Sequence, residues 1–188
     1  MSRQRFRLPD GGRVDRTTGV AFSFNGRRYF GHKGDTLASA LLANGVHLVG
    51  RSFKYHRPRG ILGSGSEEPN ALVQLGTGAR TDPNMRATTV DLFEGLRAVS
   101  QNCWPSLRLD LRSINDWLSA LLPAGFYYKT FMRPKRFWMF YEKHIRKAAG
   151  LGHAPADRDP DRYEHKYAHC DVLRFVAVDL SSVGQCQT

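Results

Sequence analysis

The chain has few cysteines, and their positions exclude several classes of site. The 188 residues contain three, Cys103, Cys170 and Cys186, which lie far apart in the sequence. No pair has the spacing of a zinc or iron–sulfur motif, and an odd number is poorly suited to a disulfide framework. The sequence therefore predicts no metal site, and we expect a reduced, cytoplasmic setting.

The chain also lacks a long apolar run. A membrane-spanning helix needs roughly 20 consecutive apolar residues, and the longest apolar stretches here are far shorter. The basic N-terminus has no apolar segment behind it, so we expect no signal peptide. These absences predict a soluble protein with no membrane partner.

Acidic residues are scarce in the first third of the chain. Residues 1–60 contain twelve Lys and Arg against three Asp, which gives +9 of the formal net charge of +11. A basic surface suits nucleic acid, acidic lipid, an anionic cofactor or an acidic protein partner, and charge alone does not choose among them.

The first hundred residues alternate strand and helix signals. Asn25-Gly26 between two β-prone runs predicts a hairpin of residues 20–24 and 27–30. Residues 35–45 have a capped helix pattern that ends at Asn44-Gly45. Strands are expected at 70–75 and 88–93, and a short apolar piece at 96–100. This order of hairpin, helix, loop and strands is that of a β-grasp fold.

From Trp104 onward the chain becomes rich in aromatic and basic residues. Helices are predicted at 113–122 and 135–149, with a surface linker at 152–161 and a new strand from Cys170. The second helix interleaves cations with aromatics, as nucleic-acid surfaces and membrane-lying helices can. Because Phe137, Phe140 and Ile145 fall at helical spacing, we predict packing there, and we expect no nucleic-acid motif.

The candidate site is a basic stretch that leads into a glycine-rich loop, residues 60–66. Its six members are predicted as contacts for an anion or another subunit: Arg51, Lys54, Tyr55, His56, Arg57 and Arg59. The alternative is a solvated basic loop anchored by Tyr55. No acid partner for His56 is visible in the sequence, so no catalytic residue is assigned.

Four stretches carry a family resemblance: residues 34–45, 51–60, 126–132 and 163–173. They resemble the alpha subunit of heterotetrameric sarcosine oxidase. The resemblance implies a β-grasp, ferredoxin-like domain fused to nucleotide-binding and folate-binding domains. It also implies oxidation of sarcosine to glycine, transfer of the one-carbon unit to tetrahydrofolate, formation of hydrogen peroxide, and beta, gamma and delta subunits as partners. The implied cofactors of the complex are FAD, FMN, NAD and tetrahydrofolate, with none in this chain.

The sequence departs from this family pattern in two places. Relatives that keep a [2Fe-2S] cluster carry cysteines in the glycine-rich loop, where this chain has Ser64 and Ser66. After Leu173 the dinucleotide fingerprint expected in the family does not follow. We therefore expect a truncated or frameshifted subunit.

The sequence thus predicts an α+β chain in three parts. A cluster-less β-grasp domain covers 1–100, a helical aromatic-rich connector covers 101–169, and the truncated first strand of a nucleotide-binding domain with a divergent tail covers 170–188. We expect a scaffold or interface role in the oxidase, with no catalysis by the fragment alone. Two alternatives stay open: a small basic module that binds nucleic acid or another polyanion, and a [2Fe-2S] electron-transfer subunit of a related amine or opine dehydrogenase.

Overall fold

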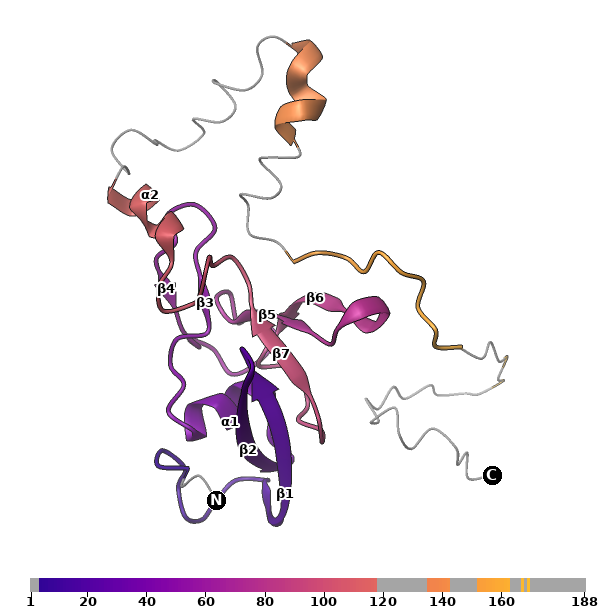
Figure 1. Cartoon of the computed structure of the whole chain (residues 1–188). Helices are drawn as coiled ribbons and strands as arrows, with labels where there is room; N and C mark the ends of the chain where they lie inside the picture. Colours follow the sequence, from indigo (N-terminus) through magenta and orange to yellow (C-terminus); the bar gives the residue numbers. More distant parts are fainter. Residues whose placement is uncertain (1–3, 118–134, 143–151, 163–166, 168, 170–188) are drawn as a thin grey trace.

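A computed structural model describes residues 4–117, 135–142, 152–162, 167 and 169. A five-stranded mixed sheet has the order β2-β1-β7-β5-β6 (Figure 1). Its strands are β1 (Asp15–Phe24), β2 (Arg27–Lys33), β5 (Leu72–Leu75), β6 (Asp82–Arg86) and β7 (Arg97–Ser100). A second, two-stranded sheet pairs β3 (Gly50–Arg51) with β4 (Pro58–Arg59). With α1 (Leu37–Ala43) against the large sheet, the predicted α+β class is confirmed.

The first hairpin forms where the sequence predicts it. Asn25 and Gly26 have φ angles of 50° and 76°, so both central residues of the turn take the left-handed region that a primed turn requires. Phe24 pairs with Arg27 directly beside this turn. The tight turn therefore sets the register of β1 against β2.

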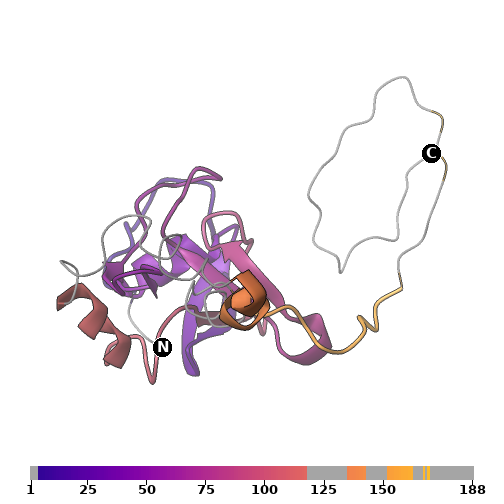
Figure 2. The same ribbon diagram turned by 90° about the horizontal axis from the view of Figure 1, so that it is seen from above.

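The helix α1 begins and ends at the predicted signals. Thr36 is the N-cap, and its side chain and that of Ser39 form a reciprocal capping box. At the other end, Gly45 donates to the carbonyl of Leu42 and Val46 to that of Leu41, which is a Schellman motif. The helix lies beside the β1–β2 hairpin in the ribbon views (Figures 1 and 2), and its residues Leu37, Ala40 and Leu41 are buried.

The hydrophobic core lies between α1 and the sheet. It gathers side chains from the hairpin, the helix, the strands β5 and β7, and the connecting segments. Its largest fully buried apolar members are Leu37, Leu41, Val49, Val73 and Leu96.

One predicted strand is wrong. Residues 88–93 do not form a strand. The strand that pairs with β5 at the edge of the sheet is β6, at Asp82–Arg86. Thr88, Val90 and Leu92 are buried while Thr89, Asp91 and Phe93 are exposed, so the alternation of the sequence is real. Their backbone instead turns past the start of α1, where Leu92 donates to the carbonyl of Asp35. The piece predicted at 96–100 supplies β7.

Beyond residue 100 the described segments are short. They comprise η2 (Leu111–Ser113), α2 (Ile114–Trp117), η4 (Lys135–Phe137) and a helical turn through residue 142. Earlier in the chain, a 3-10 turn, η1 (Gly78–Arg80), precedes β6. Residues 118–122 and 143–149 of the predicted helices, the stretch 126–132 and the predicted strand from 170 lie outside the described residues. No helix in the described part of the chain is long and apolar enough to cross a bilayer.

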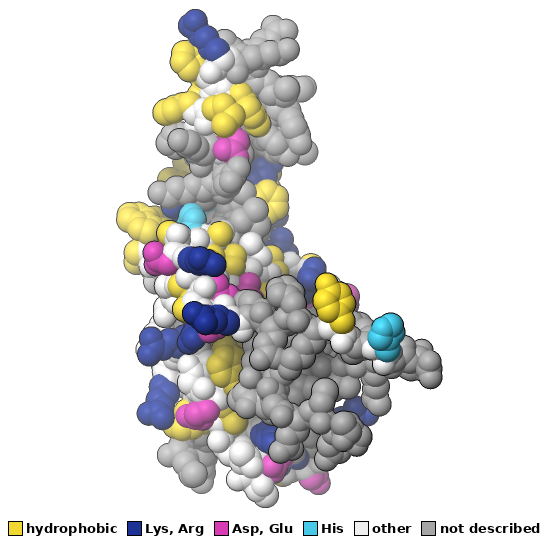
Figure 3. All heavy atoms as spheres, turned by 90° about the vertical axis from the view of Figure 1, so that its right-hand side faces the viewer, with side chains coloured by type: hydrophobic (Ala, Val, Ile, Leu, Met, Phe, Trp, Pro, Cys, Tyr) yellow, Lys and Arg dark blue, Asp and Glu magenta, His cyan; other side chains and the backbone are white. Residues whose placement is uncertain are grey.

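Two of the aromatic residues predicted to pack in the connector lie at the surface, while Ile145 lies outside the described residues. Phe137 is 43% exposed and Phe140 is 61% exposed. Their rings contact Tyr141, at centroid distances of 6.4 and 5.9 Å. Figure 3 shows hydrophobic side chains of the helical segment 135–142 at the surface, at the top of the view.

Candidate functional site

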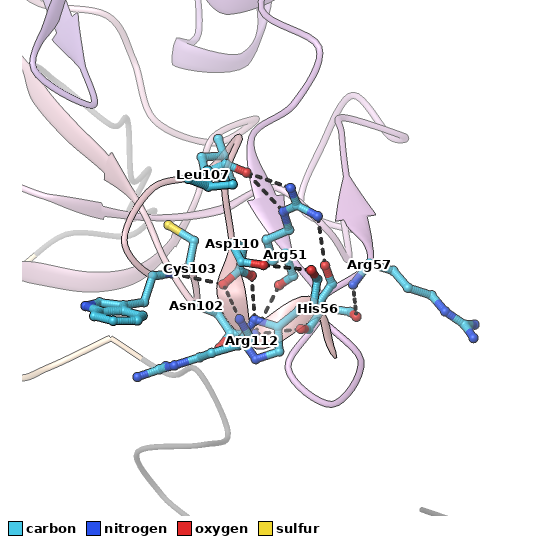
Figure 4. Close-up of polar contacts among 12 residues, drawn as sticks. Arg51, His56, Arg57, Asn102, Cys103, Leu107, Asp110 and Arg112 are labelled. Carbon is cyan, nitrogen blue, oxygen red and sulfur yellow. Dashed lines mark hydrogen bonds and ion pairs between the residues drawn. The ribbon is translucent and has the colours of Figure 1, made fainter. Parts of the chain in front are cut away.

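The basic segment, defined here as residues 51–59, is the connection between β3 and β4. It packs on residues 102–116, which follow β7 and lead into α2 (Figure 4). The two stretches are some fifty residues apart in the sequence, and three different side chains of the basic segment join them.

Arg51 joins the two stretches through backbone carbonyls. Its Nε and Nη2 atoms lie 3.0 and 2.8 Å from the carbonyl oxygen of Leu107, and Nη2 also donates to Arg108. Nη1 donates to the carbonyl of His56 at 3.0 Å, inside the segment itself. The planar guanidinium suits this arrangement, because it presents several donors in a fixed fork. Arg51 therefore serves the internal structure and has little donor capacity left for a ligand.

His56 is buried and bonded to an acidic side chain. Its Nδ1 atom lies 2.6 Å from Oδ2 of Asp110, and its own exposed fraction is 2%. Asp110 also accepts from the backbone N–H groups of Trp104 and Arg112. The expectation that His56 has no acid partner is therefore wrong. Because both side chains are buried, the pair holds two segments together and does not face a substrate.

The centre of the basic segment stacks cations on an aromatic ring. Lys54 Nζ lies 4.7 Å and Arg57 Cζ 4.9 Å from the centroid of the Tyr55 ring. Arg57 also donates from Nε to Oδ1 of Asp116 at 2.7 Å, and both side chains are about half exposed. Such exposed pairs are worth little in water, so Arg57 can exchange Asp116 for another carboxylate at small cost.

Arg59 lies on β4 beside a hollow of about 230 Å³. Arg51 and Asn102 also line it, and Arg59 is exposed. Asn102 donates from Nδ2 to the carbonyl of Ser52 at 2.6 Å, while its buried Oδ1 has no hydrogen-bond partner in the described part of the chain. The structure thus brings all six predicted residues into one segment, but turns Arg51 and His56 inward and leaves Arg57 and Arg59 at the surface.

Sequence reasoning missed the residues that hold the basic segment. Asp110 and Asn102 lie in a stretch with no motif, and the carbonyl acceptors of Leu107 and Arg108 have no side-chain signature at all. Glu68 was missed too, although its position at the end of the glycine-rich loop was a usable signal. Its carboxylate is completely buried in that loop.

The donor set of the chain does not fit an iron–sulfur cluster. A [2Fe-2S] cluster of the ferredoxin type is held by four thiolates, and the chain has three cysteines in all. The glycine-rich loop contains none of them. Cys103 lies after β7, with its Sγ 3.4 Å from the hydroxyl of Ser100. Within the described residues, no group of three or more His, Cys, Asp or Glu is placed to hold a metal ion.

Comparison with known proteins relates the chain to one family. A profile of the 2Fe-2S iron-sulfur cluster binding domain matches residues 17–103. A sarcosine oxidase subunit alpha of Rhizobium meliloti is 60% identical over 169 residues, which cover 89% of this chain and 17% of that protein. The chain is homologous to sarcosine oxidase alpha subunits. Together with the mixed sheet, the profile shows a ferredoxin-like α+β fold.

A more distant sarcosine oxidase alpha subunit, from Corynebacterium sp. strain U-96, is 42% identical over 91 residues, covering 47% of this chain and 9% of that protein. The chain therefore spans about a sixth or less of the length of the sarcosine oxidase alpha subunits it matches. The crystal structure of L-proline dehydrogenase from P. horikoshii aligns with 49% of this chain and 17% of that one, at 22% identity and a TM-score of 0.37.

Proposed function

We propose that this chain is the N-terminal part of a sarcosine oxidase alpha subunit and that it acts there as a scaffold and interface. The observation that carries the proposal is the identity of 60% over 89% of the chain. Such identity over nearly the whole chain favours the same position for this chain, within a sarcosine oxidase, as the matching segment has in the Rhizobium meliloti subunit.

The reaction of the whole enzyme would be the oxidative demethylation of sarcosine to glycine. Tetrahydrofolate would accept the one-carbon unit, and oxygen would be reduced to hydrogen peroxide. FAD, FMN and NAD would be held elsewhere in the complex of alpha, beta, gamma and delta subunits, in the cytoplasm. The flavin supplies the acceptor for the hydride of the substrate. We assign no described residue of this chain a catalytic role.

The basic segment supports an interface role. Arg51 and His56 fix its backbone from within, so little conformational entropy remains to be lost on binding. Arg57 and Arg59 stay exposed on this fixed backbone. A preorganised pair of guanidinium groups suits an acidic subunit surface or an anionic cofactor group.

We further propose that the domain works without a cluster. The count of cysteines supports this, as does the glycine-rich loop, which has no cysteine and whose interior holds the carboxylate of Glu68. A domain without a cluster can hold neighbouring subunits in place, but it cannot transfer electrons through iron.

The interface role is tested by co-expression of the tagged chain with the beta, gamma and delta subunits. We expect the wild type to co-purify subunits that absorb as flavoproteins, and the double variant Arg57→Glu/Arg59→Glu to lose most of them. Arg27→Glu/Arg28→Glu is the matched control, because these arginines are equally exposed on the first hairpin. Equal recovery with both variants would contradict the role of the basic segment. Failure of the wild type to recover any subunit would contradict the scaffold itself.

The net charge of +11 favours one other candidate, a module that binds polyanions. Non-specific binding to nucleic acid falls steeply with salt, because the protein displaces condensed counterions. Tight RNA binding with a steep salt slope and a sequence preference would support this candidate. Elution from RNA at low salt, without preference, would count against it.

A further inference from the structure

The glycine-rich loop between β4 and β5 contains two consecutive glutamates with different environments. Glu67 is exposed and accepts from the backbone N–H groups of Ser64 and Gly65, at 3.2 and 3.0 Å. Glu68 has no exposed surface. The loop thus places one carboxylate at its rim and one at its centre.

Four backbone N–H groups converge on the Glu68 carboxylate. Oε2 accepts from Leu62 at 2.7 Å and from Gly63, and Oε1 accepts from Asn70 at 2.7 Å and Ala71 at 3.3 Å. Two of the donors precede the turn of the loop and two follow it. The carboxylate therefore ties the two ends of the loop together.

The charge of Glu68 is balanced by dipoles and not by a cation. Within the described residues neither Lys nor Arg forms an ion pair with this carboxylate; Arg86 donates to its backbone carbonyl instead. Burial by itself raises the pKa of Glu68, but the hydrogen bonds from Gly63, Asn70, Leu62 and Ala71 outweigh it and lower the pKa. The group is ionised at neutral pH, and each bond to it is charge-assisted.

This environment of the Glu68 carboxylate is similar to that of an iron–sulfur cluster, which is also an anion surrounded by backbone amides. The thiolates and sulfides of a cluster carry negative charge and accept hydrogen bonds from the surrounding loop. Here the loop has serine and glycine in place of thiolate, and its interior is filled by Glu68. Thr88 closes the loop from outside through a 2.7 Å bond from its hydroxyl to the carbonyl of Gly65.

We propose that Glu68 is the internal anion around which residues 60–71 close, so that the loop of this ferredoxin-like domain is ordered without a metal cluster. The chain supplies from its own sequence the negative charge that the converging amides require. This inference rests on the cluster-free state proposed above, and the two parts of the proposal have separate measurements.

The role of Glu68 is tested by hydrogen–deuterium exchange on the full chain, comparing Glu68→Gln with Glu67→Gln. A glutamine at 68 is neutral and turns an NH₂ group toward two of the amides. We expect the amides of Leu62, Gly63, Asn70 and Ala71 to exchange about tenfold faster or more, since a hydrogen bond to a charged group is lost. Glu67→Gln should affect Ser64 and Gly65 only.

Unchanged exchange of those four amides in a folded Glu68→Gln variant would overturn the proposal. If Glu68→Gln fails to fold while Glu67→Gln folds, that difference itself supports the central role of Glu68. The cluster-free state is tested separately, by incubating the wild type anaerobically with ferrous iron and sulfide. We expect no stoichiometric iron uptake and no visible absorption. A bound cluster in the wild type would overturn the cluster-free state.

Discussion

The Nδ1 atom of His56 lies 2.6 Å from Oδ2 of Asp110, and both side chains are buried. The bond connects the β3–β4 connection to the segment that follows β7. Asp110 accepts two backbone N–H groups as well, so it organises its own segment and holds the neighbouring one. The conformation of the basic segment therefore depends on a residue outside it.

Replacing Asp110 by Ala should destabilise the chain strongly. The change leaves His56 and two backbone N–H groups without their acceptor, and breaking a buried pair in this way costs about 3–5 kcal/mol. Urea unfolding measures the loss. Asp116→Ala is the control, because its pair with Arg57 is exposed and should contribute less than about 1 kcal/mol. Equal losses in the two variants would contradict the importance of the buried pair.

Replacing Arg51 by Lys should not be conservative. A lysine cannot reach the carbonyls of Leu107, Arg108 and His56 together, so we expect a loss of about 1–3 kcal/mol in the free energy of unfolding. Arg59→Lys, on the exposed face of β4, should stay within about 0.5 kcal/mol of the wild type. If Arg51→Lys is as stable as Arg59→Lys, the carbonyl bonds do not hold the segment.

Stability should fall in acid because three carboxylates, those of Asp15, Glu67 and Glu68, have lowered pKa values. Hydrogen bonds from the side chain and backbone of Thr17 lower the pKa of Asp15 to about 2, and amide bonds lower that of Glu68 against the effect of burial. Such groups stabilise the folded state above their unfolded pKa, near 4, and the contribution is lost as pH falls through the folded value. Urea midpoints between about pH 5 and pH 2 should therefore decline less steeply in Asp15→Asn than in the wild type. Parallel declines would contradict this.

Gly60 should not tolerate a side chain. A Cβ atom at this position would lie 2.6 Å from the carbonyl oxygen of His47, which is backbone and cannot move aside easily. We expect Gly60→Ala to cost about 1–3 kcal/mol, as overpacking does. Gly19→Ala, with nothing within 4 Å of the added atom, is the control and should change stability by less than about 1 kcal/mol. Thermal unfolding of both variants gives the comparison.

The chain alone should self-associate at high concentration. Leu111, Ile114 and Trp117 are spaced three apart on one face, and each is more than half exposed. An apolar face of this kind promotes association. Size-exclusion chromatography with light scattering should show Leu111→Ser/Trp117→Ser closer to monomeric than the wild type. Leu62→Ser, which removes an isolated exposed side chain, should not differ from the wild type, and a sharp monomer peak for the wild type would refute the expectation.

Local signals in the sequence predict the first half of the fold well. The Asn25-Gly26 turn and the helix ending at Gly45 are set by φ angles and caps that neighbouring residues determine. The failure at 88–93 has a physical reason, because alternation reports which side chains are buried and not whether the backbone finds a strand to pair with. Thr88, Val90 and Leu92 are buried beside α1, and Asp91 makes only an isolated bridge to Thr36, so no strand forms there.

The site was harder to predict than the fold. The composition of residues 51–59 marks a basic segment, but Asp110 is 54 positions from His56, and nothing in either local sequence connects them. Two acceptors of Arg51 are backbone carbonyls of residues 107 and 108, which any residue type could supply. Contacts made across such distances, or to the main chain, leave no local pattern.

The parallel pairing of β1 with β7 affects how the chain can fold during synthesis. β1 lies between β2 and β7, and its residues Ser23 and Phe24 pair with Arg97 and Ala98. The hairpin emerges from the ribosome first, but its second neighbour arrives only after some seventy further residues. Pairings this distant in sequence form slowly, since a large loop must close before they contribute. Until then the nascent hairpin has an open edge, and this domain is expected to need its first hundred residues outside the exit tunnel before its sheet is complete.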